Sequence, residues 1–254
     1  MSPRAALAFL PLLVLVAGCT TPLQPPPEGN FTAPIVRPAP APYTGAYPLL
    51  YPRIRFGEMP ITLYFDVASG EGVPFFSGDT VDAARAALLQ WEQGTGGIVR
   101  FREVADASQA KVVVHWAKEL EGDHTLGLGG PTVVDTGRYN VTVNGEVTMA
   151  SMDTFCLNTV VALHELGHVL GFDHPDDPAS FLYRTADCDQ GFTPQVTEAL
   201  RELYQDPAKA ELELTGANVS ASGRFLLANL TVLNSGLVES AETGVELGAE
   251  ERIA

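Results

Sequence analysis

The sequence has few cysteines, few basic residues and a single long apolar run. Three cysteines in 254 residues are too few to build a small fold held together by disulfides. Lys and Arg number 15 against 31 Asp and Glu, which gives a formal charge of −16. This acidity argues against nucleic-acid binding and against adsorption to anionic lipid by charge alone. With 46% hydrophobic residues, the chain nevertheless has ample material for a folded core.

The apolar run lies at the N-terminus, where Ala5 to Ala17 follow Arg4. It is short for a membrane span and typical of a secretory signal. It ends Val16-Ala17-Gly18-Cys19, which resembles a bacterial lipoprotein signal, cut before a cysteine that then carries acyl chains. We therefore expect residues 1–18 to be a signal peptide and Cys19 to be a lipid anchor. The alternative is an ordinary signal peptide followed by an incidental cysteine.

Composition divides the remaining chain into three segments. Residues 19–52 are rich in proline, which favours an extended backbone, so we expect a tether that holds a domain off a membrane rather than a ligand for an SH3-like partner. Residues 53–206 show the hydrophobic patterns of a folded domain. Residues 207–254 predict a short β-rich extension, either packed on the main domain or forming part of an immunoglobulin-like fold.

The order of the expected elements in residues 53–206 predicts an α+β fold. Alternating apolar residues predict strands at 61–65, 99–104, 111–116 and 139–149, with a glycine-rich extended stretch at 125–134. Helices are predicted from the cap Asp79 to residue 93, from 160 to 170, and from Pro194, capped by Thr193, to residue 204. In the tail, short strands are predicted at 211–215, 225–234 and 243–247.

The segment from His164 to His174 is His-Glu-Leu-Gly-His-Val-Leu-Gly-Phe-Asp-His. His164 and His168 share one helix face, so both imidazoles can reach one metal ion. Gly171 permits a left-handed helix end, after which His174 can return as a third ligand. Three nitrogen ligands leave a fourth position open for water, which is typical of catalytic rather than structural zinc. Glu165 lies beside that position, as expected of a general base.

The rest of this helix is apolar on all sides, which predicts that the helix is buried. Burying His164, Glu165 and His168 without partners would cost several kcal/mol, whereas a metal with its bound water would satisfy all three. The alternative is a core helix whose histidines find other hydrogen bonds. Chance alignment of the five motif positions is on the order of 10⁻⁵, which disfavours that alternative.

The pattern His-Glu-x-x-His-x-x-Gly-x-x-His is the metzincin zinc signature, and the chain resembles the matrixin branch of these metallopeptidases over about residues 52–206. The resemblance implies a zincin-like (metzincin) domain with a twisted mixed sheet and a central zinc-binding helix. It also implies that a peptide substrate pairs in extended form with residues 126–130. Leu182, one residue before Tyr183, stands where the family has the methionine of its Met-turn. Leucine is apolar and similar in volume, so we expect the floor of the site to survive.

The remaining cysteines and histidines have other expected roles. Cys156 and Cys188 flank the zinc helix, and outside the cytoplasm a disulfide between them would tie the flanking segments together. No cysteine lies between Cys19 and Cys156, so that segment cannot supply the inhibitory thiolate of animal matrixins. His115 and His124 are too few for a separate structural zinc site, and His115 is expected in the core. The many carboxylates would permit Ca²⁺, but no calcium-loop pattern is present.

These features predict a monomeric zinc endopeptidase with one catalytic Zn²⁺, acting on extracellular or envelope proteins. It would be exported, anchored to a bacterial membrane through Cys19, and without a nucleic-acid partner. Two alternatives are an adhesion or binding lipoprotein of weakened activity and a zinc amidase acting on cell-wall peptides. The intact Glu165 favours catalysis, because a purely structural zinc site has no use for that carboxylate.

Overall fold

The computed structural model describes residues 45, 47–120, 125–222 and 225–241. The expected signal peptide, Cys19, His124 and the strand expected at 243–247 lie outside these residues. The chain divides into a larger unit, residues 40–209 with 236–238, and a smaller unit that includes residues 210–235. No helix in the described part of the chain is both long and apolar enough to cross a membrane.

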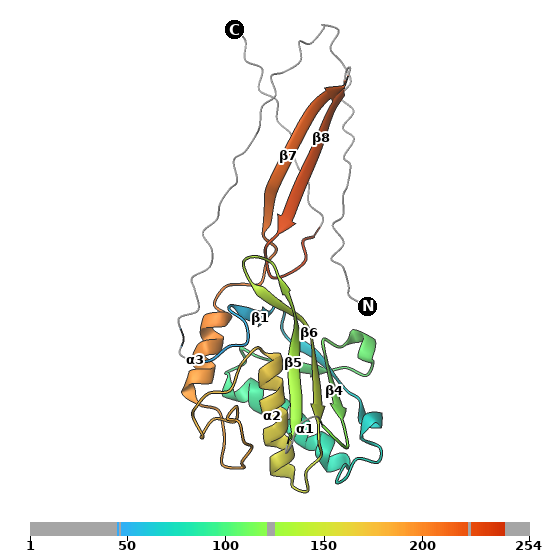
Figure 1. The fold of residues 1–254 in the computed structure, drawn as a ribbon, viewed down its shortest axis with the longest axis vertical. Helices are drawn as coiled ribbons and strands as arrows, with labels where there is room; N and C mark the ends of the chain where they lie inside the picture. The colour runs from blue at the N-terminus through green and yellow to red at the C-terminus, as the bar shows by residue number, and fades with distance from the viewer. Residues whose placement is uncertain (1–44, 46, 121–124, 223–224, 242–254) are drawn as a thin grey trace. The chain divides into compact units, whose positions relative to one another are not determined.

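The larger unit is built on a six-stranded mixed sheet (Figure 1). Its strands are β1 (Ile54–Phe56), β2 (Ile61–Phe65), β3 (Phe101–Glu103), β4 (Val112–Trp116), β5 (Gly127–Asp135) and β6 (Asn140–Met149). Strands β3, β2, β4 and β6 are parallel neighbours in that order, and β1 pairs in parallel with the first residues of β6. Strand β5 pairs antiparallel with β6 and forms an edge of the sheet. The predicted α+β class with a mixed sheet is confirmed.

Helices α1 (Gly78–Gly94) and α2 (Phe155–Val169) pack on one face of this sheet. Alternate residues of the central strands are buried against them: Ile61, Leu63, Phe65, Val112, Val114 and Trp116. Trp91 of α1 donates its indole N–H to the carbonyl of Leu163 in α2 at 3.3 Å. A third helix, α3 (Pro194–Leu203), adds Val196 and Leu200 to the same core. The short 3₁₀ turns Val67–Gly70 and Ala107–Gln109 lie in the connections.

Two helices begin earlier than the sequence predicts. The cap of α1 is Ser77 rather than Asp79, and the backbone N–H of Ser77 donates to the Thr80 hydroxyl at 3.2 Å. Helix α2 begins at Phe155 rather than at residue 160, because the Thr154 hydroxyl accepts a hydrogen bond from the backbone N–H of Leu157 at 3.3 Å. The three-residue strand β1 was not predicted, since three residues are too few to establish an alternation.

The smaller unit contains an antiparallel hairpin of β7 (Leu212–Ser222) and β8 (Phe225–Asn234). Strand β7 is longer than the predicted segment 211–215. Leu214 lies opposite Val232, and these two side chains remain 49% and 46% exposed. After the hairpin, the backbone N–H of Leu237 donates to the carbonyl of Lys209 at 2.9 Å, and the Leu237 side chain is buried. Residues 236–238 are therefore part of the larger unit, although the sequence placed them in the tail.

Candidate active site

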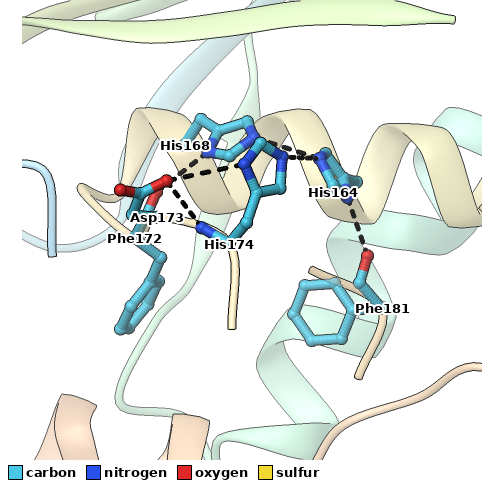
Figure 2. A network of polar contacts seen from close by, with 6 residues as sticks. All are labelled: His164, His168, Phe172, Asp173, His174 and Phe181. Atoms are coloured by element: carbon cyan, nitrogen blue, oxygen red, sulfur yellow. Dashed lines mark hydrogen bonds and ion pairs between the residues drawn. The ribbon is translucent and has the colours of Figure 1, made fainter. Parts of the chain in front are cut away.

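The three histidines of the motif converge at the C-terminal half of α2 and in the loop that follows it (Figure 2). Nε2 of His164 lies 3.0 Å from Nε2 of His168 and 3.1 Å from Nε2 of His174. Tetrahedral zinc with Zn–N bonds of about 2.0–2.1 Å places its ligand nitrogens about 3.4 Å apart. The three imidazoles therefore fit one zinc ion with small outward shifts. No other group of three His, Cys, Asp or Glu in the described residues gathers its ligand atoms so closely.

Backbone carbonyls orient two of these imidazoles. Nδ1 of His164 lies 2.9 Å from the carbonyl of Phe181, and Nδ1 of His168 lies 2.8 Å from the carbonyl of Phe172 (Figure 2). Because a carbonyl can only accept, each Nδ1 carries the proton and each Nε2 keeps its lone pair. The third imidazole, His174, has its Nδ1 3.5 Å from the carboxylate of Asp173. The hydrogen bonds of His164 and His168 thus aim the metal-binding nitrogens toward a common point.

A glycine turn returns His174 to the helix. Gly171 has φ +97°, and a Cβ at this position would collide with the side chain of Ile54. The backbone N–H of Phe172 donates to the carbonyl of Gly167 at 3.0 Å, which closes the turn. The segment before β1 holds the returning chain, since the N–H of Asp173 donates to the carbonyl of Pro48 at 3.0 Å. The sequence pattern predicts that Pro48 lies in the tether. Because Pro48 accepts this hydrogen bond, the end of the tether segment belongs to the folded unit.

Leu182 forms an apolar floor beneath the ligand helix. It is fully buried, and a Cβ at Gly167 would collide with one of its methyl groups. Gly167 lies between His164 and His168 in the sequence, so the leucine packs where the two ligands leave the helix. The turn that presents it is tight, with the backbone N–H of Leu182 donating to the Ser180 hydroxyl at 3.2 Å.

Tyr183 and Ser180 complete the turn that carries Leu182. The backbone N–H of Tyr183 donates to the carbonyl of Ser180 at 2.9 Å, and the Tyr183 side chain is partly buried. The hydroxyl of Tyr47 lies 3.0 Å from that of Ser180, which ties the turn to the chain before β1. The sequence showed no sign of the Tyr47 contact, because the two residues are 133 positions apart.

Glu165 faces the edge strand β5 and is only 5% exposed. A Cβ at Gly127 would collide with the Glu165 carboxylate, and a Cβ at Gly129 would collide with the Glu165 backbone carbonyl. The backbone N–H of Gly129 donates to the carboxylate. Helix α2 and strand β5 lie side by side in Figure 1. Because Gly127 and Gly129 have no side chains, the backbone of β5 packs directly against α2 at Glu165, the residue predicted to be the general base.

Burial dominates the electrostatics of the site. It raises the pKa of Glu165 to about 8. Burial, together with the neighbouring His168 and His174, lowers the pKa of His164 to about 4. The pKa values of His168 and His174 are lowered for the same main reason, loss of solvent. At neutral pH the imidazoles are therefore neutral, which is the form that binds a metal.

Cys156, in the first turn of α2, forms a disulfide with Cys188. His115 lies away from this region and is 31% exposed rather than in the core. Its Nδ1 is 3.1 Å from Oδ2 of Asp66, and its Nε2 is 3.7 Å from Oε1 of Glu146. The core placement expected for His115 is wrong, because its side chain meets carboxylates of neighbouring segments on a partly solvated face of the sheet.

A mixed sheet with an edge strand beside a helix, and three histidines on that helix and its following loop, defines a metallopeptidase of the metzincin type. A sequence model described as "Matrixin" matches residues 62–205, which include the three histidines, Glu165 and Leu182. The chain belongs to the matrixin family of metallopeptidases. Its clustered imidazoles fit the zinc that this family uses, and a peptidase acts on a protein or peptide substrate.

Proposed function

We propose that this chain is a zinc-dependent endopeptidase that cleaves extracellular or envelope proteins, with Glu165 as its general base. The observation that carries the proposal is the convergence of three imidazoles, two of them oriented by backbone carbonyls, beside a buried carboxylate on the same helix. A purely structural zinc site would not require that carboxylate. The absence of a fourth protein ligand among the described residues also favours a site open to substrate.

His164, His168 and His174 would hold the zinc ion. When bound, zinc supplies a Lewis acid that polarises the scissile carbonyl and makes water more acidic. Glu165 accepts the proton of the attacking water and delivers it to the leaving amine. Its burial brings its pKa close to neutrality, where a group can both take up and release a proton, and the Gly129 N–H holds its carboxylate in place.

The edge strand β5 supports a substrate bound in extended form. Its other edge carries no strand among the described residues, so backbone groups there other than the Gly129 N–H are available to a peptide. Gly127 and Gly129 place this strand directly beside Glu165. A peptide paired with β5 would therefore pass the base with its backbone exposed, as cleavage within a chain requires.

The location outside the cytoplasm is supported by two features. The N-terminal segment has the pattern of a lipoprotein signal ending at Cys19. The Cys156–Cys188 disulfide is the kind of bond that persists in oxidising compartments. We propose that the protein is exported and held at a bacterial membrane by its lipidated N-terminus, and that it acts as a monomer.

One observation favours a binding protein instead. The hairpin β7–β8 exposes several large apolar side chains, among them Leu214, Val232 and Leu233. A second alternative is a zinc amidase acting on cell-wall peptides, which would need the same three ligands and the same base. The test below distinguishes the endopeptidase from both alternatives.

The test measures zinc content and hydrolysis of casein and of purified cell wall by the full chain. Removing zinc with a chelator should abolish cleavage, and adding zinc should restore it. Glu165→Gln should retain zinc and lose at least about 10²-fold in rate. Glu119→Gln, an exposed carboxylate, is the control. Cleavage of casein by Glu165→Gln at the parent rate would refute the role of Glu165 as the base. If the parent protein cleaves cell wall but not casein, it is an amidase. If the parent binds zinc and cleaves neither, it is a binding protein.

A further inference from the structure

The loop that carries the floor of the zinc site is closed on itself. The backbone N–H of Phe181 donates to the carbonyl of Gly191 at 3.1 Å, and that of Gly191 donates to the carbonyl of Ala179 at 3.0 Å. The side-chain amide of Gln190 donates to the carbonyl of Thr185 at 2.7 Å. Residues 179–191 therefore form one hydrogen-bonded segment. A restraint on the position of one end limits the positions that the other end can take.

The inner end of this segment touches the ligand helix at the site itself. Phe181 supplies the carbonyl that accepts from Nδ1 of His164, and Figure 2 shows the two residues facing each other. Leu182 packs on Gly167. Both Phe181 and Leu182 are fully buried. The orientation of one zinc ligand therefore depends on where this segment lies.

The outer end is joined to the same helix by the disulfide. Cys156 lies in the first turn of α2, about 12 Å along the helix axis from His164. Cys188 is exposed, as are Arg184, Thr185, Asp187 and Asp189 around it. Ala186 packs against the core, and the cross-link is the covalent attachment of this part of the segment to α2. Exposure of Cys188 also leaves the bond open to thiol–disulfide exchange.

We propose that the Cys156–Cys188 disulfide positions the floor segment and thereby sets the zinc affinity of the site, so that the metallopeptidase matures by oxidation. This inference rests on the proposed zinc-dependent function. In the reduced chain the histidines are present, but the outer part of the segment has lost its covalent attachment to α2, so the Phe181 carbonyl holds His164 less firmly in its binding orientation. Loss of such an outer hydrogen-bond partner lowers metal affinity by about 10- to 100-fold.

Oxidation proceeds by exchange with a disulfide oxidant. The two thiols release two protons and two electrons, one S–S bond forms in the chain, and the S–S bond of the oxidant is reduced to two thiols. No inhibitory cysteine lies between Cys19 and Cys156. If the disulfide forms only after export, the reduced enzyme binds zinc weakly while it is still in a reducing compartment. No propeptide thiolate is needed for this latency.

The test compares zinc dissociation constants, measured by competition with a chromophoric chelator, for the oxidised full chain, the same chain reduced with a phosphine, and the double variant Cys156→Ser/Cys188→Ser. We expect the reduced chain and the double variant to bind zinc about 10- to 100-fold more weakly than the oxidised chain. Titration with thiol–disulfide buffers should show zinc affinity changing in step with the thiol count. The phosphine should leave the double variant unchanged, which controls for direct effects of the reductant.

A stability role alone makes a different prediction. Near-ultraviolet circular dichroism and denaturant unfolding of the zinc-free proteins measure whether the reduced chain stays folded at the assay temperature. Equal zinc affinity in the oxidised and the folded reduced chains would overturn the proposal, as would loss of zinc only in step with global unfolding. Failure of the proposed function is distinct, because the oxidised chain would then bind no zinc or would bind zinc without hydrolysis.

Discussion

Helix α2 and the hairpin β7–β8 are both rich in apolar residues, yet only one of them is buried. Nearly every residue of α2 from Asn158 onward is buried. In the hairpin, Leu212, Leu214, Leu227, Val232 and Leu233 are all more than a third exposed. A helix can be covered by a sheet, a second helix and a loop, whereas two strands alone have no layer to pack against. The comparison shows that burial, more than apolar content, is what allows α2 to hold polar groups in a defined geometry.

The largest expected effect concerns the buried carboxylate of Glu165 in the zinc-free protein. Its pKa is about 8 in the folded state against an ordinary 4.5, so between these values the folded state keeps a proton that the unfolded state releases. The free energy of unfolding should therefore fall as pH rises from 4.5 to 8, with a contribution of up to about 1.4 kcal/mol per pH unit. Glu165→Gln should lack this contribution, as measured by denaturant unfolding across that range.

The difference between the parent and Glu165→Gln is the useful quantity, because the histidines act in the opposite direction. Their lowered pKa values reduce stability as pH falls below 6.5 in both proteins. Glu119→Gln, which changes an exposed carboxylate, should keep the parent slope. Parallel curves for Glu165→Gln and the parent would mean that α2 does not bury this charge in solution.

The second effect tests how closely β5 approaches α2. A Cβ added by Gly129→Ala would collide with the backbone carbonyl of Glu165, which cannot rotate away. We expect a loss of about 1–3 kcal/mol in the free energy of unfolding and a fall in peptidase rate. The neighbouring Gly130→Ala is the matched control, because its Cβ meets nothing within 4 Å. Equal stability of the two variants would show that the strand and the helix are not in backbone contact.

A smaller effect is expected at the floor of the site. Leu182→Met changes shape but not volume, so unfolding free energy should change by less than about 1.5 kcal/mol, with zinc affinity retained. Leu182→Ala, which leaves a cavity, should cost about 2–5 kcal/mol and provides the contrast. A large gain in peptidase rate for Leu182→Met would instead mean that the methionine sulfur contributes more than packing.

The smallest effect is expected from the hairpin. Residues 211–235 can be replaced by a short Gly-Ser linker, because the Lys209 carbonyl and the Leu237 N–H are 2.9 Å apart. Zinc affinity and peptide hydrolysis should stay within about twofold of the parent, as for independent sites. Leu237→Ala in the intact chain should cost about 2–5 kcal/mol, since that side chain is buried. A tenfold loss of activity on excision of the hairpin would show that the hairpin takes part in peptide hydrolysis.

Much of the fold could be predicted because its signals are local. The alternation of Ile61, Leu63 and Phe65, and the 3.6-residue period of α1, place the core faces of those elements. Element starts were less predictable, since Ser77 and Thr154 are recognised as caps only through the hydrogen bonds they make. Strand β1 is too short to carry a pattern, and it exists because β6 pairs with it.

The sequence by itself determined which three histidines gather, because helical spacing and one permissive glycine bring His164, His168 and His174 to the same side of the helix. Only the tertiary structure decided what surrounds these histidines and Glu165: the Phe181 carbonyl, the glycines of β5 beside Glu165, and the pairing of Pro48 with Asp173. These contacts join segments far apart in the chain. Their partners are chosen by packing and backbone hydrogen bonding, and no residue pattern near either partner encodes that choice.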